Sequence, residues 1–321
     1  MEFVAASELP SGEGWQYEPK WDGFRCILSR RGRSVRLWSK AGRPLERYFP
    51  EIVECALNVR AARFVLDGEL VIAAERGGSF DELLQRIHPA RSRVAALAKS
   101  TPALFVAFDL LGDHKGGNVK KLPLEDRRVR LERFAKEFFR PARCVRLSPA
   151  TTALGTARQW LRRERGEFDG VVAKRLAQRY EPKTRKYGVK VKRKKSADCV
   201  VGGFRYAANG GVGSLLLGLY DRQGKLHHVG FISGLSAEER TRLAKALRPL
   251  IRRPGFTGRA PGGPSRWRKR DAGDWLPLAP TLVVEAEFDK VTGGRIRHAA
   301  RLRRWRPDKR ASQCTMAQLN G

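Results

Sequence analysis

A run of basic residues from 183 to 195 divides this chain into two parts whose sequence patterns differ. Before the run, short apolar stretches of strand type alternate with stretches whose apolar residues recur at helical spacing, a pattern typical of an α+β domain. After it, three strand-type stretches follow one another directly, and a helix and two more strands come next. Three strands, a helix and two strands within about 125 residues are typical of a small five-stranded barrel of the OB type. A chain of 321 residues is long enough for two domains, and we place them at residues 1–195 and 196–321.

The positions of the expected elements follow from apolar periodicity and from turn residues. In the first part we predict strands over 16–30, 34–39, 64–72, 103–111 and 168–175, and helices over 50–57, 80–87, 127–139 and 152–165. In the second part we predict strands over 197–206, 213–220, 226–232, 281–291 and 295–304, with a helix that starts at Ser236. Two of the helices carry a capping box, in which a serine is followed three residues later by a glutamate: Ser79 with Glu82, and Ser236 with Glu239.

The charge of the chain indicates a polyanionic partner. There are 65 Lys and Arg residues against 33 Asp and Glu residues, which gives a formal net charge of +32 that is spread along the whole chain. Nucleic acid is the favoured partner, because no segment is apolar enough to cross a bilayer and no basic amphipathic helix dominates. The five cysteines are scattered and form no Cys-x-x-Cys pair, which argues against a zinc ribbon or a disulfide framework. With no secretory signal in the first 14 residues, we expect a reducing, cytoplasmic location.

The segment that most suggests chemistry runs from Glu18 to Arg25 and reads Glu-Pro-Lys-Trp-Asp-Gly-Phe-Arg. It places Lys20 beside an acid, a glycine and an arginine, which is an arrangement suited to a nucleophilic lysine that faces a phosphate. Lys-x-Asp-Gly also occurs in ordinary surface turns, so the segment needs support from the rest of the chain. Five further segments supply groups that such a reaction uses: Asp67-Gly68-Glu69, Phe105–Leu111, Asp169–Lys174, Lys190-Val191-Lys192 and Arg306–Lys309. Taken singly, each has a plainer reading as a bulge, a core aromatic, an exposed strand face or a polar turn.

In this order, the six segments resemble the motifs of the covalent nucleotidyltransferases, and most closely those of the ATP-dependent DNA ligases. The resemblance covers nearly the whole chain. The compact length, the Phe-Asp-Leu-Leu stretch at 108–111 and the ending Arg304–Lys309 are similar to the bacterial two-domain ligases, first the C-type (LigC) and next the ligase module of the D-type (LigD). The resemblance implies an N-terminal nucleotidyltransferase (adenylation) domain followed by a C-terminal OB-fold β-barrel domain.

The resemblance also implies a reaction with ATP. Lys20 would attack the α-phosphate of ATP to form a lysine–AMP phosphoramidate, AMP would pass to a 5′-phosphate at a nick, and the neighbouring 3′-hydroxyl would displace it. Crowding by other lysines would favour the neutral, nucleophilic form of the Lys20 amine. The further catalytic residues implied are Lys190, Lys192, Arg306 and Lys309.

Nucleotide and metal contacts are implied in the same way. Phe108 would stack on adenine, with Val172 on its other face, and Arg25 would contact the ribose or the nick phosphate. Glu69 and Asp169 would hold Mg²⁺ or Mn²⁺. The residues expected to contact the nucleotide are Glu18, Arg25, Lys40, Glu69, Phe108, Val172, Lys174, Lys190 and Lys192. Arg306 and Lys309 would orient the pyrophosphate, which implies a hinge near Lys195 and a closure of the two domains.

Three departures from the family pattern carry expectations of their own. Asp169 stands where the family usually has glutamate, so its metal contact is expected to be longer or mediated by water. Lys40 stands where the family generally has arginine, and it lacks the bidentate fork of a guanidinium group. The Pro-Met-Leu-Ala type of segment is absent from residues 1–10, which predicts an adenine pocket that lacks part of one wall.

We therefore expect a monomeric, ATP-dependent DNA ligase that acts on nicked double-stranded DNA in repair and associates with a bacterial nucleoid. A DNA-end-binding protein or a repair polymerase would be a natural partner. Two alternatives stay open at this point. One is an RNA ligase or an mRNA capping-type enzyme, which would differ in nucleotide or substrate. The other is a non-catalytic OB-fold DNA-binding protein. An NAD-dependent ligase is disfavoured, because it usually carries a cysteine zinc module.

Overall fold

The computed structural model of the chain describes residues 3–72, 80–140, 142–162, 168–182, 184, 188–208, 210–262 and 275–319. The chain divides into two compact units, Met1–Arg193 and Lys194–Gly321, which we describe separately. Within the described ranges, no helix is both long enough and apolar enough to span a membrane.

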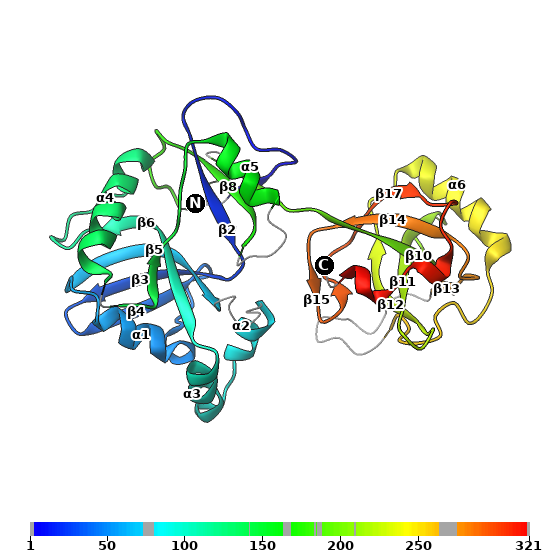
Figure 1. The fold of residues 1–321 in the computed structure, drawn as a ribbon, viewed down its shortest axis with the longest axis horizontal. Coiled ribbons are helices and arrows are strands. Elements are labelled where there is room, and N and C mark those ends of the chain that lie inside the picture. The colour runs from blue at the N-terminus through cyan, green and yellow to red at the C-terminus, as the bar shows by residue number, and fades with distance from the viewer. Residues whose placement is uncertain are drawn as a thin grey trace. The chain divides into compact units, whose positions relative to one another are not determined.

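Two sheets form the first unit (Figure 1). In the part of the chain that is described, a five-stranded sheet has the order β4-β3-β5-β6-β7, and a four-stranded sheet has the order β1-β9-β8-β2. The strands of the larger sheet are β3 (Phe24–Arg31), β4 (Ser34–Ser39), β5 (Arg63–Ile72), β6 (Ala103–Gly112) and β7 (Val145–Leu147). Those of the smaller sheet are β1 (Val4–Ala5), β2 (Trp15–Trp21), β8 (Phe168–Arg175) and β9 (Gly188–Lys192).

The strand predicted over 16–30 is wrong as a single element. The structure divides it into β2 and β3, which belong to different sheets, and the chain crosses between the sheets at Asp22 and Gly23. A Cβ atom at Gly23 would lie 2.0 Å from the backbone oxygen of Leu70, so only glycine allows this close approach. The crossing leaves Lys20 close to the end of β2, beside both sheets.

The described helices of this unit are α1 (Pro50–Leu57), α2 (Phe80–Arg86), α3 (Arg91–Ser100), α4 (Leu124–Phe138) and α5 (Leu154–Arg162). Helices α1, α2 and α4 pack against the larger sheet, α3 contacts α1, and α5 packs against β2 and β8 of the smaller sheet. All the predicted helices of this unit are present: α1 has the predicted bounds, the others have shifted ends, and residues 163–165 of the helix predicted over 152–165 lie outside the described residues. Elements α3, β1, β7 and β9 were not predicted. Phe49, Phe64 and Phe105 are among the largest buried side chains of this unit. Ser79, the proposed cap of α2, lies outside the described residues.

The second unit is built on a sheet with the order β12-β11-β10-β14-β17, with β13 paired to β10. Its elements are β10 (Lys195–Tyr206), β11 (Val212–Tyr220), β12 (Leu226–Ile232), α6 (Ala237–Leu247), β13 (Leu276–Pro277), β14 (Val283–Phe288), β15 (Val291–Thr292), β16 (Arg295–Ile296) and β17 (Arg301–Trp305). The predicted capping box of α6 is confirmed, because Ser236 and Glu239 bond to each other's backbone N–H groups. The strand predicted over 295–304 is divided into β16, which closes a tight hairpin with β15, and β17, which pairs with β14.

The predicted α+β class is confirmed, but the described residues of the second unit do not form a closed barrel. In the described residues its edge strands are joined only by a parallel bridge between Ile232 and Ala300, without a continuous ladder. The physical reason is the short overlap of the edges, since Ile232 is the last residue of β12 and Ala300 directly precedes β17. At this bridge the N–H of Ala300 donates to the backbone oxygen of Phe231 at 2.8 Å.

One covalent link was not predicted. Cys55 in α1 and Cys144 before β7 form a disulfide across 89 residues of sequence. Cys26, Cys199 and Cys314 are buried and unbonded.

Candidate active site

A cavity in the first unit brings most of the predicted site residues together. Of its lining residues in the described chain, Glu18, Lys20, Arg25, Glu69, Phe108, Val172, Lys174 and Lys190 were predicted, and Phe3, Pro19 and Trp21 were not. They come from both sheets of the unit, which explains why no local stretch of sequence contains the site. Asp169 and Lys192 lie beside the cavity on the same strands as its lining residues.

The register of the smaller sheet aligns these side chains in rows. Lys20 on β2 pairs with Gly170 on β8, which in turn pairs with Lys192 on β9. Residues directly opposite in antiparallel strands point to the same face of a sheet, so Lys20 and Lys192 share a face. Gly170 between them contributes no side chain, and a Cβ there would lie 2.2 Å from the oxygen of Val191.

The next row contains Val172, which was expected on one face of the adenine, between two further residues expected to contact the nucleotide. Glu18 pairs with Val172, and Val172 pairs with Lys190. Because successive side chains alternate between faces, Glu18 and Lys20 on β2 project to the same side. Strand register therefore brings together groups that lie up to 172 positions apart in the sequence, from Glu18 to Lys190.

A bulge in this sheet turns Asp169 toward Lys20. The pairing shifts between Lys20–Gly170 and Trp21–Phe168, so Asp169 is the extra residue with no partner on β2. Bulges change the direction of the side chain that they expel from the ladder. Nζ of Lys20 donates to Oδ1 of Asp169 at 2.6 Å, and both side chains are mostly buried. The nucleophile predicted from the sequence is thus held by the acid predicted as a metal ligand.

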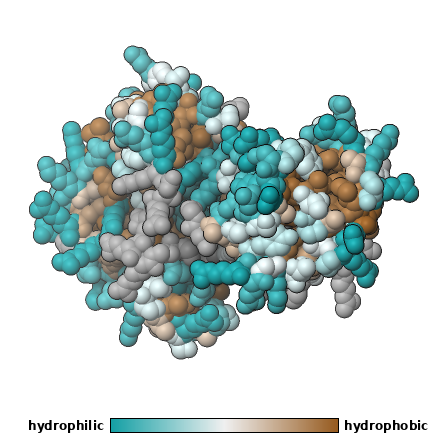
Figure 2. Space-filling model, turned by 45° about the vertical axis from the view of Figure 1, so that its right-hand side comes forward, coloured by the Kyte–Doolittle hydropathy of each residue, from teal (hydrophilic) through white to brown (hydrophobic). Residues whose placement is uncertain are grey.

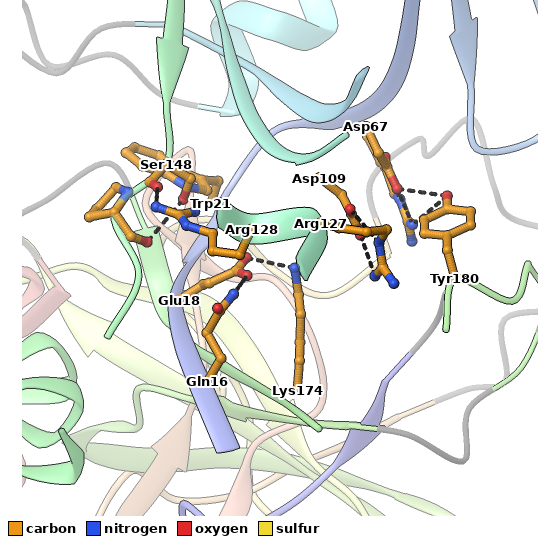
Figure 3. A network of polar contacts seen from close by, with 12 residues as sticks. Gln16, Glu18, Trp21, Asp67, Asp109, Arg127, Arg128, Ser148, Lys174 and Tyr180 are labelled. Atoms are coloured by element: carbon orange, nitrogen blue, oxygen red, sulfur yellow. Dashed lines mark hydrogen bonds and ion pairs between the residues drawn. The ribbon is translucent and has the colours of Figure 1, made fainter. Parts of the chain in front are cut away.

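Lys174 is held by a second carboxylate. Its Nζ donates to Oε2 of Glu18 at 2.6 Å, and the other oxygen of Glu18 accepts from Nε2 of Gln16 at 2.7 Å (Figure 3). The side chains of Lys174 and Glu18 are only 4% and 3% exposed. The lysine nitrogen also lies 4.6 Å from the ring centroid of Phe108, a distance suited to a cation–π interaction. Lys20 was expected to be surrounded by other lysines, but Lys20 and Lys174 are each paired with a carboxylate.

Arg25 is fixed by a network that was only partly expected. Its Nε and Nη2 donate to the two oxygens of the buried Asp67 at 3.1 and 2.6 Å. The hydroxyl of Tyr180 donates to the same carboxylate at 2.8 Å (Figure 3). The Arg25 guanidinium lies 5.8 Å from the ring of Phe108. Tyr180 was not predicted as a site residue, and no motif from the sequence analysis includes it.

Phe108 is anchored from behind by its neighbour. Asp109 accepts hydrogen bonds from Nε and Nη2 of Arg127 at 2.8 and 2.9 Å, and both side chains are buried (Figure 3). Nη1 of Arg127 also donates to the backbone oxygens of Leu122 and Gln178. A buried, doubly hydrogen-bonded pair of this kind is rigid, so it fixes the part of β6 that presents the aromatic ring.

Glu69 is a candidate metal ligand whose ionisation is perturbed. Burial raises the pKa of its carboxyl to about 8, although the charges of Lys20 and Arg25 act in the opposite direction. Among the described residues, no cluster of three or more His, Cys, Asp or Glu side chains could hold a metal by itself. Mg²⁺ is usually held by one or two carboxylates together with substrate phosphates and water. Asp169 accepts a hydrogen bond from Lys20, and the charge of Lys20 also acts on Glu69. Both carboxylates are therefore close to the same amine, and the pair fits such an ion.

The first described residues, where the segment usual in the family is absent, contribute an aromatic side chain to the cavity. β1 pairs in parallel with β9, with Val4 opposite Val189 and Ala5 opposite Lys190. This pairing places Phe3 in the cavity, 6.0 Å from Nζ of Lys174. Its ring packs where Gly188 has no side chain, since a Cβ at Gly188 would lie 2.7 Å from the ring. The pairing of β1 with β9 thus adds an aromatic side chain to the cavity, although the segment usual in the family is absent.

The remaining predicted residues lie elsewhere. Lys40 lines a neighbouring groove with Arg43 and Arg47, and that groove shares Arg25 and Glu69 with the first cavity. Arg306 and Lys309 belong to the second unit, where both pair with Asp198.

Comparison with known proteins gives concordant results for both units. Residues 5–192 match the family described as "ATP dependent DNA ligase domain", and residues 208–309 match "ATP dependent DNA ligase C terminal region". The chain is 42% identical to DNA ligase C2 of Mycolicibacterium smegmatis, over 98% of this chain and 92% of that protein. It is 41% identical to DNA ligase C of Mycobacterium tuberculosis, over 94% of this chain and 88% of that protein.

Solved structures add a similarity of fold. A mycobacterial DNA ligase D complexed with ATP and MES matches with a TM-score of 0.50 and 29% identity, over 98% of this chain and 97% of that one. A Lig E DNA ligase matches with a TM-score of 0.53, over 95% of this chain and the whole of the other, but at 17% identity this likeness shows the fold alone.

Proposed function

This chain belongs to the ATP-dependent DNA ligases, as the order of its motifs predicted, and from that premise we propose that it seals nicks in duplex DNA through an AMP group carried on Lys20. The observation that carries the proposal is the position of the Lys20 amine. It lies in a cavity lined by an aromatic ring, by carboxylates and by other lysines, and a carboxylate fixes it there. Family membership favours this function over a capping-type enzyme or a non-catalytic DNA-binding protein.

The proposed chemistry transfers AMP twice. Nζ of Lys20, after loss of a proton, attacks the α-phosphorus of ATP, so that an N–P bond forms and the bond to pyrophosphate breaks. The 5′-phosphate of the nick then attacks the same phosphorus, and Lys20 leaves. Finally the 3′-hydroxyl attacks the activated 5′-phosphate, AMP leaves, and the phosphodiester is complete. Transfers of this type depend mainly on positioning and on neutralisation of charge.

The groups around Lys20 suit this task. We propose that Phe108 and Val172 hold the adenine and that Phe3 closes the pocket beside them. Lys190 and Lys192 project from β9 toward the α-phosphate, and Lys174 adds positive charge from beneath Phe108 while it holds Glu18. Arg25 contacts the ribose or the nick phosphate, and its rigid pairing with Asp67 supports that positioning role. Asp169 orients the Lys20 amine and is the nearest group on this chain that can accept its proton.

Glu69 and Asp169 are the residues that would hold Mg²⁺ or Mn²⁺. A bound divalent ion would neutralise charge on the triphosphate and polarise the phosphorus that is attacked. The pKa of about 8 for Glu69 suits a metal ligand, because a nearby cation would stabilise the ionised carboxylate that burial disfavours. We propose ATP and one of these ions as the cofactors.

The DNA substrate would be recognised largely through its phosphates. The net charge of +32 supports this mode, because contacts from Lys and Arg to phosphate supply most of the affinity of such proteins. Hydrophilic side chains cover much of the face drawn in Figure 2. We assign the 5′-phosphate of the nick to the groove that contains Lys40, because this groove shares Arg25 and Glu69 with the nucleotide cavity. Arg306 and Lys309 are proposed to contact the pyrophosphate part of ATP in the first step.

The cellular setting is also a proposal. The chain is 32% identical to part of a Mycobacterium tuberculosis protein named multifunctional non-homologous end joining DNA repair protein LigD, over 93% of this chain and 37% of that protein. This name supports a role in bacterial DNA repair. We further propose that the protein is a cytoplasmic, nucleoid-associated monomer and that an end-binding protein or a repair polymerase is its partner.

The decisive experiment is covalent labelling. The protein is incubated with ATP labelled at the α-phosphate and with Mg²⁺ or Mn²⁺, and is then denatured and tested for bound label. We expect labelling of the wild type and of Lys99→Ala, a lysine at the end of α3 that serves as control, and none of Lys20→Ala. Labelling by GTP, or label retained by Lys20→Ala, would contradict the proposal. Sealing of a nicked duplex, compared with nicked RNA, then tests the substrate.

A further inference from the structure

The carboxylate of Asp198 holds both cations that the sequence placed at the end of the chain. Asp198 is in β10, and Oδ1 accepts a hydrogen bond from Nη1 of Arg306 at 2.9 Å. The other oxygen, Oδ2, accepts from Nζ of Lys309 at 2.5 Å. Asp198 was not predicted as a site residue, and it lies more than 100 positions from either cation.

The position of Asp198 is itself built into the fold. Its backbone N–H donates to Oε1 of Gln318 at 3.0 Å, and its backbone oxygen accepts from Nε2 of the same side chain at 3.0 Å. Gln318 lies in a short 3-10 helix, Met316–Leu319, which is packed against the sheet. Arg306 pairs on its outer side with Asp308, which is 64% exposed, whereas the Asp198 side chain is only 11% exposed. Asp198 is therefore the inner, fixed partner.

This geometry has an electrostatic consequence. Two cations that touch the same carboxylate lie close together, and without that carboxylate they would repel each other and separate. Each of the two cationic side chains is also long and flexible. Because Asp198 already holds them, less conformational entropy is lost when they bind a ligand. A pair of adjacent, ordered cations matches a diphosphate, whose negative charge is spread over neighbouring phosphoryl groups.

We propose that Asp198, held by Gln318, is a positioning residue that presents Arg306 and Lys309 to the pyrophosphate part of ATP in the adenylylation of Lys20. The inference rests on the proposed function. It predicts that Asp198 matters for the step that releases pyrophosphate and does not matter for sealing of a nick that already carries AMP, because that step involves no pyrophosphate.

The same sheet offers a matched control. Glu285 on β14 is the cross-strand partner of Asp198, and it also binds two cations, Arg303 at 3.2 Å and Arg304 at 2.7 Å. These arginines are 60% and 64% exposed and lie outside the proposed pyrophosphate site. Glu285→Gln thus removes an equivalent carboxylate from the same sheet without touching Arg306 or Lys309.

The test compares two reactions of the full-length protein. The first is single-turnover labelling of Lys20 over a range of ATP concentrations, and the second is sealing of a pre-adenylylated nicked duplex without ATP. For Asp198→Asn we expect labelling at saturating ATP to slow by about 10- to 100-fold, the loss typical of misplaced reacting groups, while sealing stays within about twofold. Gln318→Ala should show the same pattern with a smaller loss, and Glu285→Gln should change neither reaction.

Other outcomes overturn the inference in identifiable ways. A parallel loss of labelling and of sealing in Asp198→Asn would mean a structural role, and thermal unfolding of the variant would show it directly. Unchanged labelling would mean that Asp198 does not position the cations in the reaction. A wild type that takes no label would contradict the proposed function itself and not this inference.

Discussion

The amine of Lys20 on β2 donates a hydrogen bond at 2.6 Å to the carboxylate of Asp169, the bulged residue of β8. The bulge leaves Asp169 without a partner on β2, and its carboxylate is turned toward the nucleophile. An aspartate side chain is one methylene shorter than the glutamate that is usual at this position in the family. The bulge and the short side chain together determine where the amine lies.

Asp169→Asn should impair adenylylation of Lys20 while the fold is preserved. The amide keeps the shape of the side chain but loses the charge that orients the amine, so we expect labelling to slow by about 10- to 100-fold. Asp169→Glu keeps the charge and should retain labelling within about tenfold of the wild type, by the same reasoning. Rapid-quench labelling measures both variants. Wild-type kinetics in Asp169→Asn would show that this pair does not contribute to the reaction.

Phe3→Ala should weaken binding of ATP more than it slows the chemical step. The ring lines the proposed nucleotide cavity and lies beside Lys174, so its loss removes binding surface. We expect the KM for ATP to rise by about tenfold, which corresponds to about 1.4 kcal/mol, with kcat nearly unchanged. Val4→Ala is the control, because Val4 is the next residue and its side chain is 51% exposed. If Phe3→Ala and Val4→Ala raised the KM for ATP equally, the effect would be due to disruption of β1 and not to the loss of the Phe3 ring.

Gly23→Ala should destabilise the first unit. Its new Cβ would lie 2.0 Å from the backbone oxygen of Leu70, and backbone cannot move aside as a flexible side chain can. We expect a loss of about 2–3 kcal/mol in the free energy of unfolding, as for other overpacked sites. Gly155→Ala, in α5 with open space around it, should be neutral or stabilising by up to about 1 kcal/mol. Chemical denaturation measures both, and a stable Gly23→Ala protein would show that the two sheets can separate here.

His228 should make the second unit sensitive to acid. Burial, with the nearby charges of Arg295, Arg205 and Arg259, lowers the pKa of His228 from 6.5 to about 3. Between these values the unfolded chain binds a proton that the folded chain excludes, so the stability due to this group is present above pH 6.5 and is lost as the pH falls toward 3. The slope is at most about 1.4 kcal/mol per pH unit.

The measurement is thermal unfolding between pH 7 and pH 5 for the wild type and for His228→Asn. Asparagine can still accept the hydrogen bond that Arg295 donates to Nδ1 at 3.0 Å, but it does not titrate. The melting temperature of the wild type should therefore fall more steeply with acidification than that of the variant. Parallel curves would mean that the pKa of His228 is the same in the folded and the unfolded chain.

Much of the site could be predicted because its residue types are chemically unusual on strands. A lysine, two acids and a glycine within apolar stretches are costly unless they serve a site, and their order along the chain matched a known family. Lys20, Glu69, Phe108, Val172 and Lys174 all line the cavity in which they were expected. The helix beginning at Ser236 was predictable for a local reason, since its capping box is encoded by residues three positions apart.

The parts that were missed depend on contacts between distant segments. The division of the strand over 16–30 follows from the contact of Gly23 with Leu70, which no local pattern shows. Phe3 reaches the cavity only because two residues of β1 pair with β9, and a strand of this length has no detectable periodicity. Asp198 resembled any acid at the start of an apolar strand until the fold brought Arg306 and Lys309 to it. The barrel was predicted from the number of strands, which does not determine whether the edges overlap.

The parallel pairing of β1 with β9 also bears on how this enzyme is prepared and immobilised. A purification tag at the N-terminus would be attached two residues from Phe3, which lines the cavity, and one at the C-terminus would be attached three residues from Gln318, which holds Asp198. The turn between β11 and β12 is a better position for a fluorophore or a surface linker. Arg222 and Gln223 in that turn are exposed, and Gly224 has no atom within 4 Å of where its Cβ would be. A cysteine introduced at Gln223 would carry a label without changing the residues that line the cavity or the contacts of Asp198.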